Sequence, residues 1–420
     1  MDIAAKLLFL IILGVTIYTY AGYPLVLFVL GLFKRNSGTS SSLDEYPSVA
    51  LIISAHDEKK IIREKIENSL KLDYPKDRLR IIIASDGSVD GTNDIVREYE
   101  CGNVVLKAFD SREGKSAALN KAVFGLEEDI LIFSDANAFY KEDTVKKLVH
   151  KFSCEDVGCV VGHLVYLENH SYVGKGESLY WRYESLLNRL ESRLGSVLVA
   201  TGTIFAMRRE LFRPVMQDVA NDFQLPAEIS SQGFRVVYES EAIAYERSTY
   251  YFREEFSRKR RIIVRGLTGF KYMRSSFGST LRIFQFVSRK LLRWWVGPML
   301  PILYFANLLL IKEPLFLVLF ALQNIFYLFA AIGSFLRRGR KVQSRLFFIP
   351  FYFVMVNTAA FTAIVTYVGG SRLSSWDKAE TTRDVNEHPM ITPRLRVIEG
   401  RGKLSYQEKE NGLKNLEKIP

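Results

Sequence analysis

Four runs of residues without a charged side chain constrain this chain more than any other feature. They occupy residues 7–33, 294–311, 314–336 and 346–370 of a chain of 420 residues. A helix rises about 1.5 Å per residue, so about 20 apolar residues cross the hydrocarbon core of a bilayer. We therefore expect an N-terminal transmembrane helix over residues 5–33 and a second transmembrane region over residues 294–370.

The first run is expected to remain as an anchor. The apolar region of a cleaved signal peptide spans about 7–15 residues and ends at a small-residue cleavage site. The run here continues to Phe33, and Gly22-Tyr23-Pro24 does not resemble such a site. A signal peptide is therefore the weaker reading of this segment.

Positive charge is concentrated beside the apolar runs. Residues 256–293 contain eleven Lys or Arg and no Asp or Glu, which equals the formal net charge of +11. A basic segment can bind anionic lipid, phosphate groups or nucleic acid. Because a long apolar run follows at once, we expect this juxtamembrane segment to contact membrane lipid and not nucleic acid.

Charge also predicts how the chain is oriented. Basic residues follow the first run at Lys34-Arg35 and separate the last two runs at residues 337–345. By the positive-inside rule, the region between the membrane segments lies in the cytoplasm, at the inner or plasma membrane. If every run crosses once, both termini lie outside. The alternative is that residues 294–311, with Pro298 and Pro301, are re-entrant or interfacial.

Between the membrane regions, short apolar runs alternate with charged stretches of helical periodicity. A polar linker at 34–45 leads into a domain at 46–255, and a polar tail follows at 371–420. Strands and helices are expected in turn at residues 49–54, 58–72, 80–84, 91–99, 104–108, 116–125, 130–133 and 142–152. This order predicts an α/β fold with a mostly parallel sheet covered on both faces.

Carboxylates follow several of the predicted strands. The strand ends read His56-Asp57-Glu58, Asp86-Gly87-Ser88 and Asp135-Ala136-Asn137. A single carboxylate at such a place can simply cap the following helix. Ligands bind beyond the carboxyl ends of the strands in parallel sheets, so one nucleotide site explains all three clusters together.

A diphosphate bound at these strand ends would need a cation. No GxxxxGK[ST] or GxGxxG loop follows a strand, and the three cysteines lack the spacing of a zinc site. Asp135 and Asn137 offer oxygen ligands to Mg²⁺ or Mn²⁺, ions that one or two carboxylates hold together with substrate phosphates. The ion would neutralise charge on a nucleoside-diphosphate leaving group.

The motifs of the domain resemble those of the membrane-bound family-2 glycosyltransferases with the GT-A (Rossmann-like) fold. The resemblance covers about Tyr46 to Gly266, and its order and spacing are more specific than any one motif. The motifs are Ser54–Glu58 (SAHDE), Ser85–Thr92 (SDGSVDGT), Gly114–Asn120 (GKSAALN), Ser134–Asn137 (SDAN), Thr201–Arg208 (TGTIFAMR), Asn221-Asp222 and Gly233–Glu239 (GFRVVYE).

The resemblance implies a nucleotide-sugar site and an inverting displacement. Asp135 and Asn137 stand at the family's metal-binding DxD, and Asp222 stands at its catalytic base, which takes a proton from the acceptor hydroxyl. The implied donor is a nucleotide sugar, expected to be UDP-linked, and the implied acceptor is lipid-linked or a glycan. The residues implied to bind the donor are Ala55, Glu58, Asp86, Gly114, Lys115, Asn120, Ser134, Arg258 and Arg261.

The sequence departs from the family pattern at three places. His56-Asp57 replaces the usual Tyr-Asn, and Asn137 replaces the second carboxylate of DxD, which predicts weaker metal binding. Residues 258–262 (RKRRI) lie where processive synthases carry QxxRW, so the Trp that would stack on an acceptor sugar is missing. Short transfer is therefore favoured over a processive synthase that exports its polymer. A third reading is a transporter or scaffold with a degenerate nucleotide domain.

Overall fold

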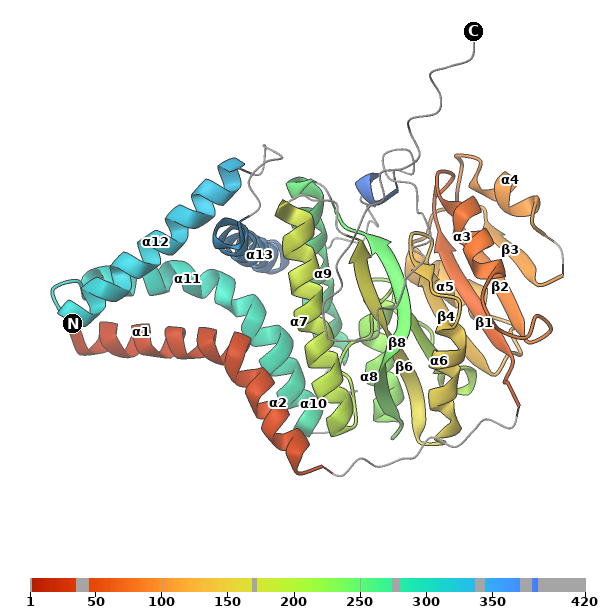
Figure 1. Cartoon of the computed structure of the whole chain (residues 1–420), viewed down its shortest axis with the longest axis horizontal. Coiled ribbons are helices and arrows are strands. Elements are labelled where there is room, and N and C mark those ends of the chain that lie inside the picture. The colour runs from red at the N-terminus through yellow and green to blue at the C-terminus, as the bar shows by residue number, and fades with distance from the viewer. Residues whose placement is uncertain are drawn as a thin grey trace, which may run out of the picture. The chain divides into compact units, whose positions relative to one another are not determined.

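The computed structural model describes residues 2–34, 45–100, 102–167, 172–249, 251–273, 280–336, 344–370 and 380–383. Most of the predicted linker and tail lies outside these ranges. Figure 1 shows a domain built around a β-sheet and, beside it, long helices from both ends of the chain.

The domain alternates strands and helices as the sequence predicts. Every strand and helix expected between residues 49 and 152 is present, with ends that differ by a few residues. In chain order the elements are β1 Val49–Ala55, α3 Ile62–Leu70, β2 Leu79–Asp86, α4 Thr92–Arg97, β3 Val104–Phe109, α5 Lys115–Val123, β4 Ile130–Asp135, β5 Phe139–Tyr140, α6 Thr144–His150, β6 Val157–Leu167, α7 Tyr172–Leu194, β7 Phe205–Arg208, α8 Asn221–Ser231, β8 Arg235–Arg247 and α9 Phe252–Met273.

The strands form one eight-stranded sheet in the order β3-β2-β1-β4-β7-β6-β8-β5. The first half, from β3 to β4, is parallel, as expected for βαβ units. In the second half, β7 runs antiparallel to both β4 and β6, while β8 pairs in parallel with β6. The α/β prediction is thus confirmed, with antiparallel pairs added at β7 and β5.

The register of the parallel half brings the predicted site residues to one edge. Ser54 on β1 pairs with Asp135 on β4, and Ala55 pairs with Ser85 on β2. Asp86 follows Ser85 at the end of β2. The three strands therefore end at the same level, which places their polar termini side by side.

Apolar packing fixes this edge from behind. All of β1 is buried, as near-continuous apolar strands are in parallel sheets. Phe133 on β4 stacks on Phe205 of β7 with ring centroids 4.9 Å apart. Residues of α5 and α8, including Leu119 and Leu225, join the same buried cluster. The strands that carry the site are therefore held by a close-packed core.

Helices α7 and α9 lie between the sheet and the long helices (Figure 1). Helix α7 is amphipathic and runs from Tyr172 to Leu194. Its side chain Leu187 packs with Tyr23 and Leu27 of the N-terminal helix. The domain thus contacts the apolar helices through α7.

Three described helices are long and apolar enough to cross a membrane. They are Ile3–Leu32, which comprises α1 Asp2–Ile17, a π-helical turn at Tyr18–Gly22 and α2 Tyr23–Leu32, then α12 Pro314–Leu336 and α13 Arg345–Val368. They correspond to the apolar runs expected at residues 7–33, 314–336 and 346–370. The run at 294–311 does not give such a helix by itself.

That fourth run belongs to a longer helix that starts in the basic segment. Helix α10 Thr280–Phe286 continues through a π-helical turn at Val287–Leu291 into α11 Leu292–Leu309. Helical geometry therefore runs across the expected boundary between residues 293 and 294. Helix α11 packs on α1 through a cluster that includes Phe9 and Leu303. Just beyond the C-terminal end of α11, Glu313 Oε1 lies 2.6 Å from Lys6 Nζ of α1.

The expectation that the basic segment mainly contacts lipid is also corrected for several of its cations. Arg289 and Arg293 are buried and form ion pairs with Glu184 of α7, at 2.7 and 2.5 Å. Arg289 also pairs with Glu191 at 2.5 Å. The charge count could not reveal this, because the acidic partners lie about one hundred residues earlier in the chain.

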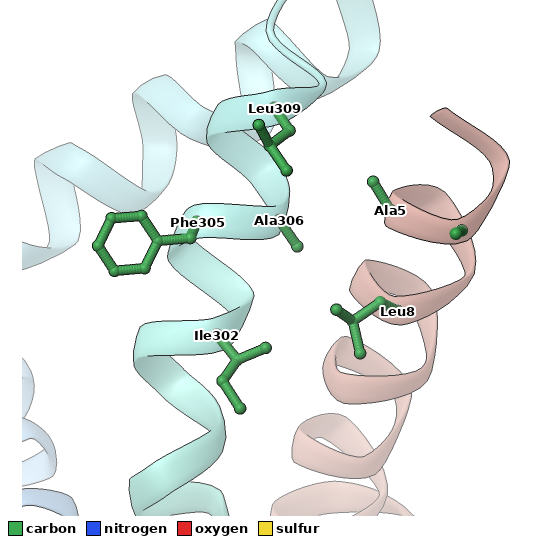
Figure 2. Close-up of a pocket in the computed structure, with 7 residues that line it drawn as sticks. Ala5, Leu8, Ile302, Phe305, Ala306 and Leu309 are labelled. Atoms are coloured by element: carbon green, nitrogen blue, oxygen red, sulfur yellow. The ribbon is translucent and has the colours of Figure 1, made fainter. Parts of the chain in front are cut away.

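An apolar pocket of about 460 Å³ lies between α1 and α11. Figure 2 shows Leu8 and Ile302 pointing toward each other across it. The other lining residues are Ala4, Ala5, Phe305, Ala306 and Leu309. None of them carries a polar side chain, so this pocket has no group that could bind a diphosphate.

Candidate functional site

Asp86 organises the loop that precedes α5. Its carboxylate accepts backbone N–H bonds from Glu113 and Gly114, both at 2.8 Å. The following Gly87 has φ +61°, and a Cβ there would lie 2.5 Å from the backbone N of Arg112. Only glycine permits this close approach of the two loops. Asp86 thus holds Gly114 and the start of α5 at the strand ends.

Lys115 and Asp135 meet at the centre of this edge. Lys115 is the first residue of α5, and its ammonium group contacts the Asp135 carboxylate at the end of β4. Nearby, the buried Lys65 donates to Ser134 Oγ at 2.9 Å. Burial lowers the pKa of Lys65 to about 7, and the Asp135 charge opposes that shift. The site therefore holds the Lys115 ammonium group beside a carboxylate, and such a cation is suited to binding a phosphate oxygen.

Asn137 lies next to a carboxylate that the sequence analysis did not single out. Its amide nitrogen donates to Glu246 Oε1 at 2.8 Å and lies 3.4 Å from Thr382 Oγ1. Glu246 belongs to β8 and is 6% exposed. Burial raises the pKa of Glu246 to about 7, with Asp135 adding to the shift and Arg258 opposing it. The oxygen Oε2 of Glu246 is buried and has no hydrogen-bond partner among the described residues.

Asp222 is brought to the site by helix α8. It lies in the first turn of α8, and its Oδ2 approaches Gly202, where a Cβ would lie 3.1 Å away. Burial raises the pKa of Asp222, while the charges of Lys115 and Arg265 oppose this. Ser116, the neighbour of Lys115, donates to the Val219 carbonyl oxygen at 3.2 Å, so the start of α5 lies against the segment that leads into Asp222.

The opening loop after β1 is held by its unusual residues. His56 Nδ1 lies 2.6 Å from the Asp86 carbonyl oxygen, so this departure from Tyr-Asn links two neighbouring strand ends. The backbone N–H of Glu58 donates to Thr92 Oγ1 at 2.8 Å. The buried Glu58 carboxylate accepts a bond from Arg383 Nε at 2.6 Å. A residue far along the chain therefore reaches this loop.

Two of the predicted donor-binding residues, Asn120 and Arg258, have other partners. The Asn120 amide bonds the backbone of Val215 in both directions, at 2.8 and 2.7 Å. Arg258 forms ion pairs with Glu177 and Glu255. Arg261 lies on α9 near Arg258, half-buried. Asn120 and Arg258 thus support the walls of the site instead of pointing freely into it.

The oxygen ligands offered by this site fit a divalent cation. No three His, Cys, Asp or Glu side chains of the described residues gather as a metal site. Asp135 and Glu246 nevertheless supply two carboxylates beside the Asn137 amide, and Mg²⁺ or Mn²⁺ takes its other oxygens from phosphates and water. The buried, unpartnered oxygen of Glu246 is the observation that favours a cation at this place.

Sequence reasoning missed Glu246, Lys65 and Arg383. Glu246 lies near the end of β8, so the rule used for Asp86 and Asp135 would have found it if that strand had been predicted. Lys65 looked like one charge on an amphipathic helix, and nothing in the sequence shows that Arg383 reaches Glu58.

Residues 50–215 match the sequence profile described as "Glycosyl transferase family 2". This segment is a family 2 glycosyltransferase domain. It contains Asp86, Lys115 and Asp135, whereas Asp222 and Glu246 lie beyond the matched range. Their assignment therefore rests on the geometry above.

Curated relatives agree with this family. "Probable glycosyltransferase YdaM" of Bacillus subtilis is 28% identical over 233 residues, which is 51% of this chain and 54% of that protein. "Beta-monoglucosyldiacylglycerol synthase" of Synechocystis is 31% identical over 119 residues, 27% of this chain and 25% of that protein. The chain thus spans about half or less of the length of these relatives.

A solved structure supports the GT-A fold. The mannosyltransferase PcManGT of Pyrobaculum calidifontis, in complex with GDP-Man and Mn²⁺, matches with a TM-score of 0.66 at 20% identity. The match covers 87% of this chain and 99% of that one. The family 2 domain here therefore has the GT-A fold, as the motifs predict.

Proposed function

We propose that the chain is an inverting glycosyltransferase that moves a sugar from a nucleoside-diphosphate donor to an acceptor hydroxyl at a membrane surface. The observation that carries this proposal is that Lys115 contacts Asp135 while the adjacent Ser116 bonds Val219, three residues before Asp222. Such a site offers a base on one side of a sugar and positive charge on the other. The donor and ion in the PcManGT complex are consistent with the same chemistry.

Asp222 is the proposed general base. It accepts the proton of the acceptor hydroxyl as that oxygen attacks the anomeric carbon. Because its pKa is raised, the Asp222 carboxylate is a stronger base than an ordinary one. A single displacement inverts the anomeric carbon and requires no covalent nucleophile.

The proposed diphosphate site is the start of α5. Gly114 gives the loop an open backbone with φ +98°, and Lys115 adds a cation at the first helical residue. Backbone N–H groups at a helix start attract phosphate oxygens. A divalent ion on Asp135 would stabilise the departing diphosphate when bound.

The acceptor is proposed to be lipid-linked or a glycan held near the bilayer. Helices α7 and α9 join the sheet domain to the apolar helices, so a transferred sugar would be added close to the membrane (Figure 1). The relatives named as glycolipid synthases are consistent with a lipid acceptor. We propose the cytoplasmic face of the cell membrane from the basic residues that flank the helices.

A processive synthase is the second candidate. Relatives from Staphylococcus epidermidis named "Poly-beta-1,6-N-acetyl-D-glucosamine synthase" are 21% and 22% identical over 221 residues. Against it, Arg258 on α9 is engaged with Glu177 and Glu255, and residues 258–262 contain no Trp. Product length separates the two candidates, since long polymer from one binding event would exclude single transfer.

The test is a screen of nucleotide sugars on protein in lipid nanodiscs, scored by release of nucleoside diphosphate. Asp222→Asn should abolish transfer and keep nucleotide binding, because it removes the base and retains the shape of the side chain. Asp156→Asn is the control, since Asp156 pairs with Arg235 at the protein surface. Full activity of Asp222→Asn would exclude Asp222 as the base.

A further inference from the structure

One negative charge is missing from the expected metal site. Asp135 carries a carboxylate, but Asn137 carries a neutral amide at the position of the second carboxylate of DxD. Hard divalent cations bind more weakly as the number of anionic ligands falls. The site must therefore obtain this charge elsewhere or bind its ion weakly.

Glu246 supplies a carboxylate in contact with Asn137. Its Oε1 accepts a bond of 2.8 Å from the Asn137 amide nitrogen. The two residues are separated by about one hundred positions in the chain, and the sheet brings them together because β8 ends beside the loop that follows β4. Asp135 ends β4 two residues before Asn137, so this contact lies next to the first carboxylate of the motif.

The second carboxylate oxygen of Glu246, Oε2, argues for a ligand. The residue is 6% exposed, yet its Oε2 has no hydrogen-bond partner among the described residues. A buried carboxylate oxygen without a partner is costly, and native proteins rarely leave one. If Glu246 only held Asn137 in place, Oε1 would be enough, and a glutamine would serve at lower cost.

We infer that Glu246 is the second carboxylate ligand of the divalent cation, and that Asn137 positions it. In this arrangement Asp135 and Glu246 Oε2 face the ion, and the Asn137 amide holds Glu246 Oε1. Position 246 thus supplies the second carboxylate that the family pattern carries at position 137. This inference rests on the proposed function, which requires a cation at the diphosphate.

The test measures Mn²⁺ alone, by electron paramagnetic resonance of the free ion, with no donor or acceptor present. Glu246→Gln keeps the size of the side chain and removes its charge, so it should weaken Mn²⁺ binding by about 10- to 100-fold. Glu239→Gln on the same strand is the control, because Glu239 pairs with Lys151 away from the site. It should leave Mn²⁺ binding unchanged.

A charge swap makes the test specific. Asn137→Asp combined with Glu246→Gln returns a carboxylate to position 137 and preserves a hydrogen bond between the two side chains. This double variant should bind Mn²⁺ within about three-fold of the wild type, since the number of anionic ligands is restored. A structural role for Glu246 predicts no such rescue.

The outcomes separate this inference from the proposed function. Wild-type Mn²⁺ affinity in Glu246→Gln overturns the inference. So does a double variant that folds but still binds Mn²⁺ weakly. Neither result affects the proposed sugar transfer. Loss of transfer in every screen, with the expected Mn²⁺ pattern, overturns only the proposed function. If Glu246→Gln does not fold, crystals of the wild type soaked in Mn²⁺ decide, because an anomalous peak on Asp135 without Glu246 overturns the inference.

Discussion

Gly202 lies against the carboxylate proposed as the base, and replacing it with alanine should move that group by a small amount. A Cβ at this position would lie 3.1 Å from Asp222 Oδ2 and 3.6 Å from Asp222 Cγ. The shorter distance is tighter than an ordinary contact between carbon and oxygen, so the carboxylate must yield by a few tenths of an ångström. The backbone of Gly202 is not in the left-handed region, so the effect is one of space alone.

The size of the effect follows from this displacement. A misplacement of about 1 Å can cost about 10²-fold in rate. A shift of a few tenths should therefore lower kcat by roughly 2- to 5-fold, which is on the order of 1 kcal/mol in the barrier. Removal of the base by Asp222→Asn should cost more, about 10²- to 10⁴-fold. The expected order is wild type, then Gly202→Ala, then Asp222→Asn.

The assay is steady-state release of nucleoside diphosphate from protein in nanodiscs. Gly202→Ala should lower kcat and leave the donor KM near the wild-type value, because the base acts on the acceptor and not on the bound donor. Gly31→Ala is the matched control, since no described atom outside the neighbouring turns of its own helix backbone lies within 4 Å of a Cβ there. A wild-type kcat for Gly202→Ala, with inactive Asp222→Asn, would refute the placement of Asp222 described above.

Four further outcomes follow from the structure. The value of kcat/KM should fall as the pH falls through the raised pKa of Asp222, because only the ionised carboxylate accepts a proton. The midpoint should lie above the usual Asp pKa of about 3.9, and an unshifted midpoint in a pH–rate profile would contradict this. Glu184→Gln should lower the free energy of unfolding by about 3–5 kcal/mol in denaturation experiments, because Arg289 and Arg293 lose a buried partner. Gly158→Ala should cost about 1–3 kcal/mol of stability through overpacking against Ile229 with unchanged KM, as thermal unfolding and kinetics can show. Chelation of divalent ions should stop diphosphate release and added Mn²⁺ should restore it, whereas transfer that persists in chelator would exclude the ion.

The parallel half of the sheet was predictable from residue patterns because its strands carry local signals. Continuous apolar runs such as Val49–Ala55 mark buried parallel strands, and polar residues mark where they end. The expected clustering of Asp86 and Asp135 then follows from topology alone. Strand direction has no such local signal, so the antiparallel placement of β7 could not be read from the sequence.

The parts of the site that the sequence did not predict depend on contacts between distant segments. Glu246 meets Asn137 only because β8 closes the sheet beside β5. In the same way, Arg289 looked like a lipid-facing charge until Glu184 and Glu191 of α7 were placed against it. A charge count describes how many cations a segment has, and only packing shows which of them meet a partner.

The contact between Lys6 and Glu313 determines which ends of the long helices emerge together. It joins the start of α1 to the turn between α11 and α12, so these two points share one face of any bilayer that the helices cross. At the other end, the Tyr23 and Phe284 rings lie 5.9 Å apart, so α10–α11 accompanies α1–α2 in the opposite direction.

Beyond α12, the chain again contacts the sheet domain. Tyr352 of α13 donates to Glu255 of α9 at 2.7 Å, and after α13 the Arg383 guanidinium reaches Glu58. The start of α13 and Arg383 therefore both contact the sheet domain. A count of apolar runs puts the C-terminal tail on the opposite face, and these contacts bring residues 382–383 back to the strand ends where the sugar donor is expected to bind.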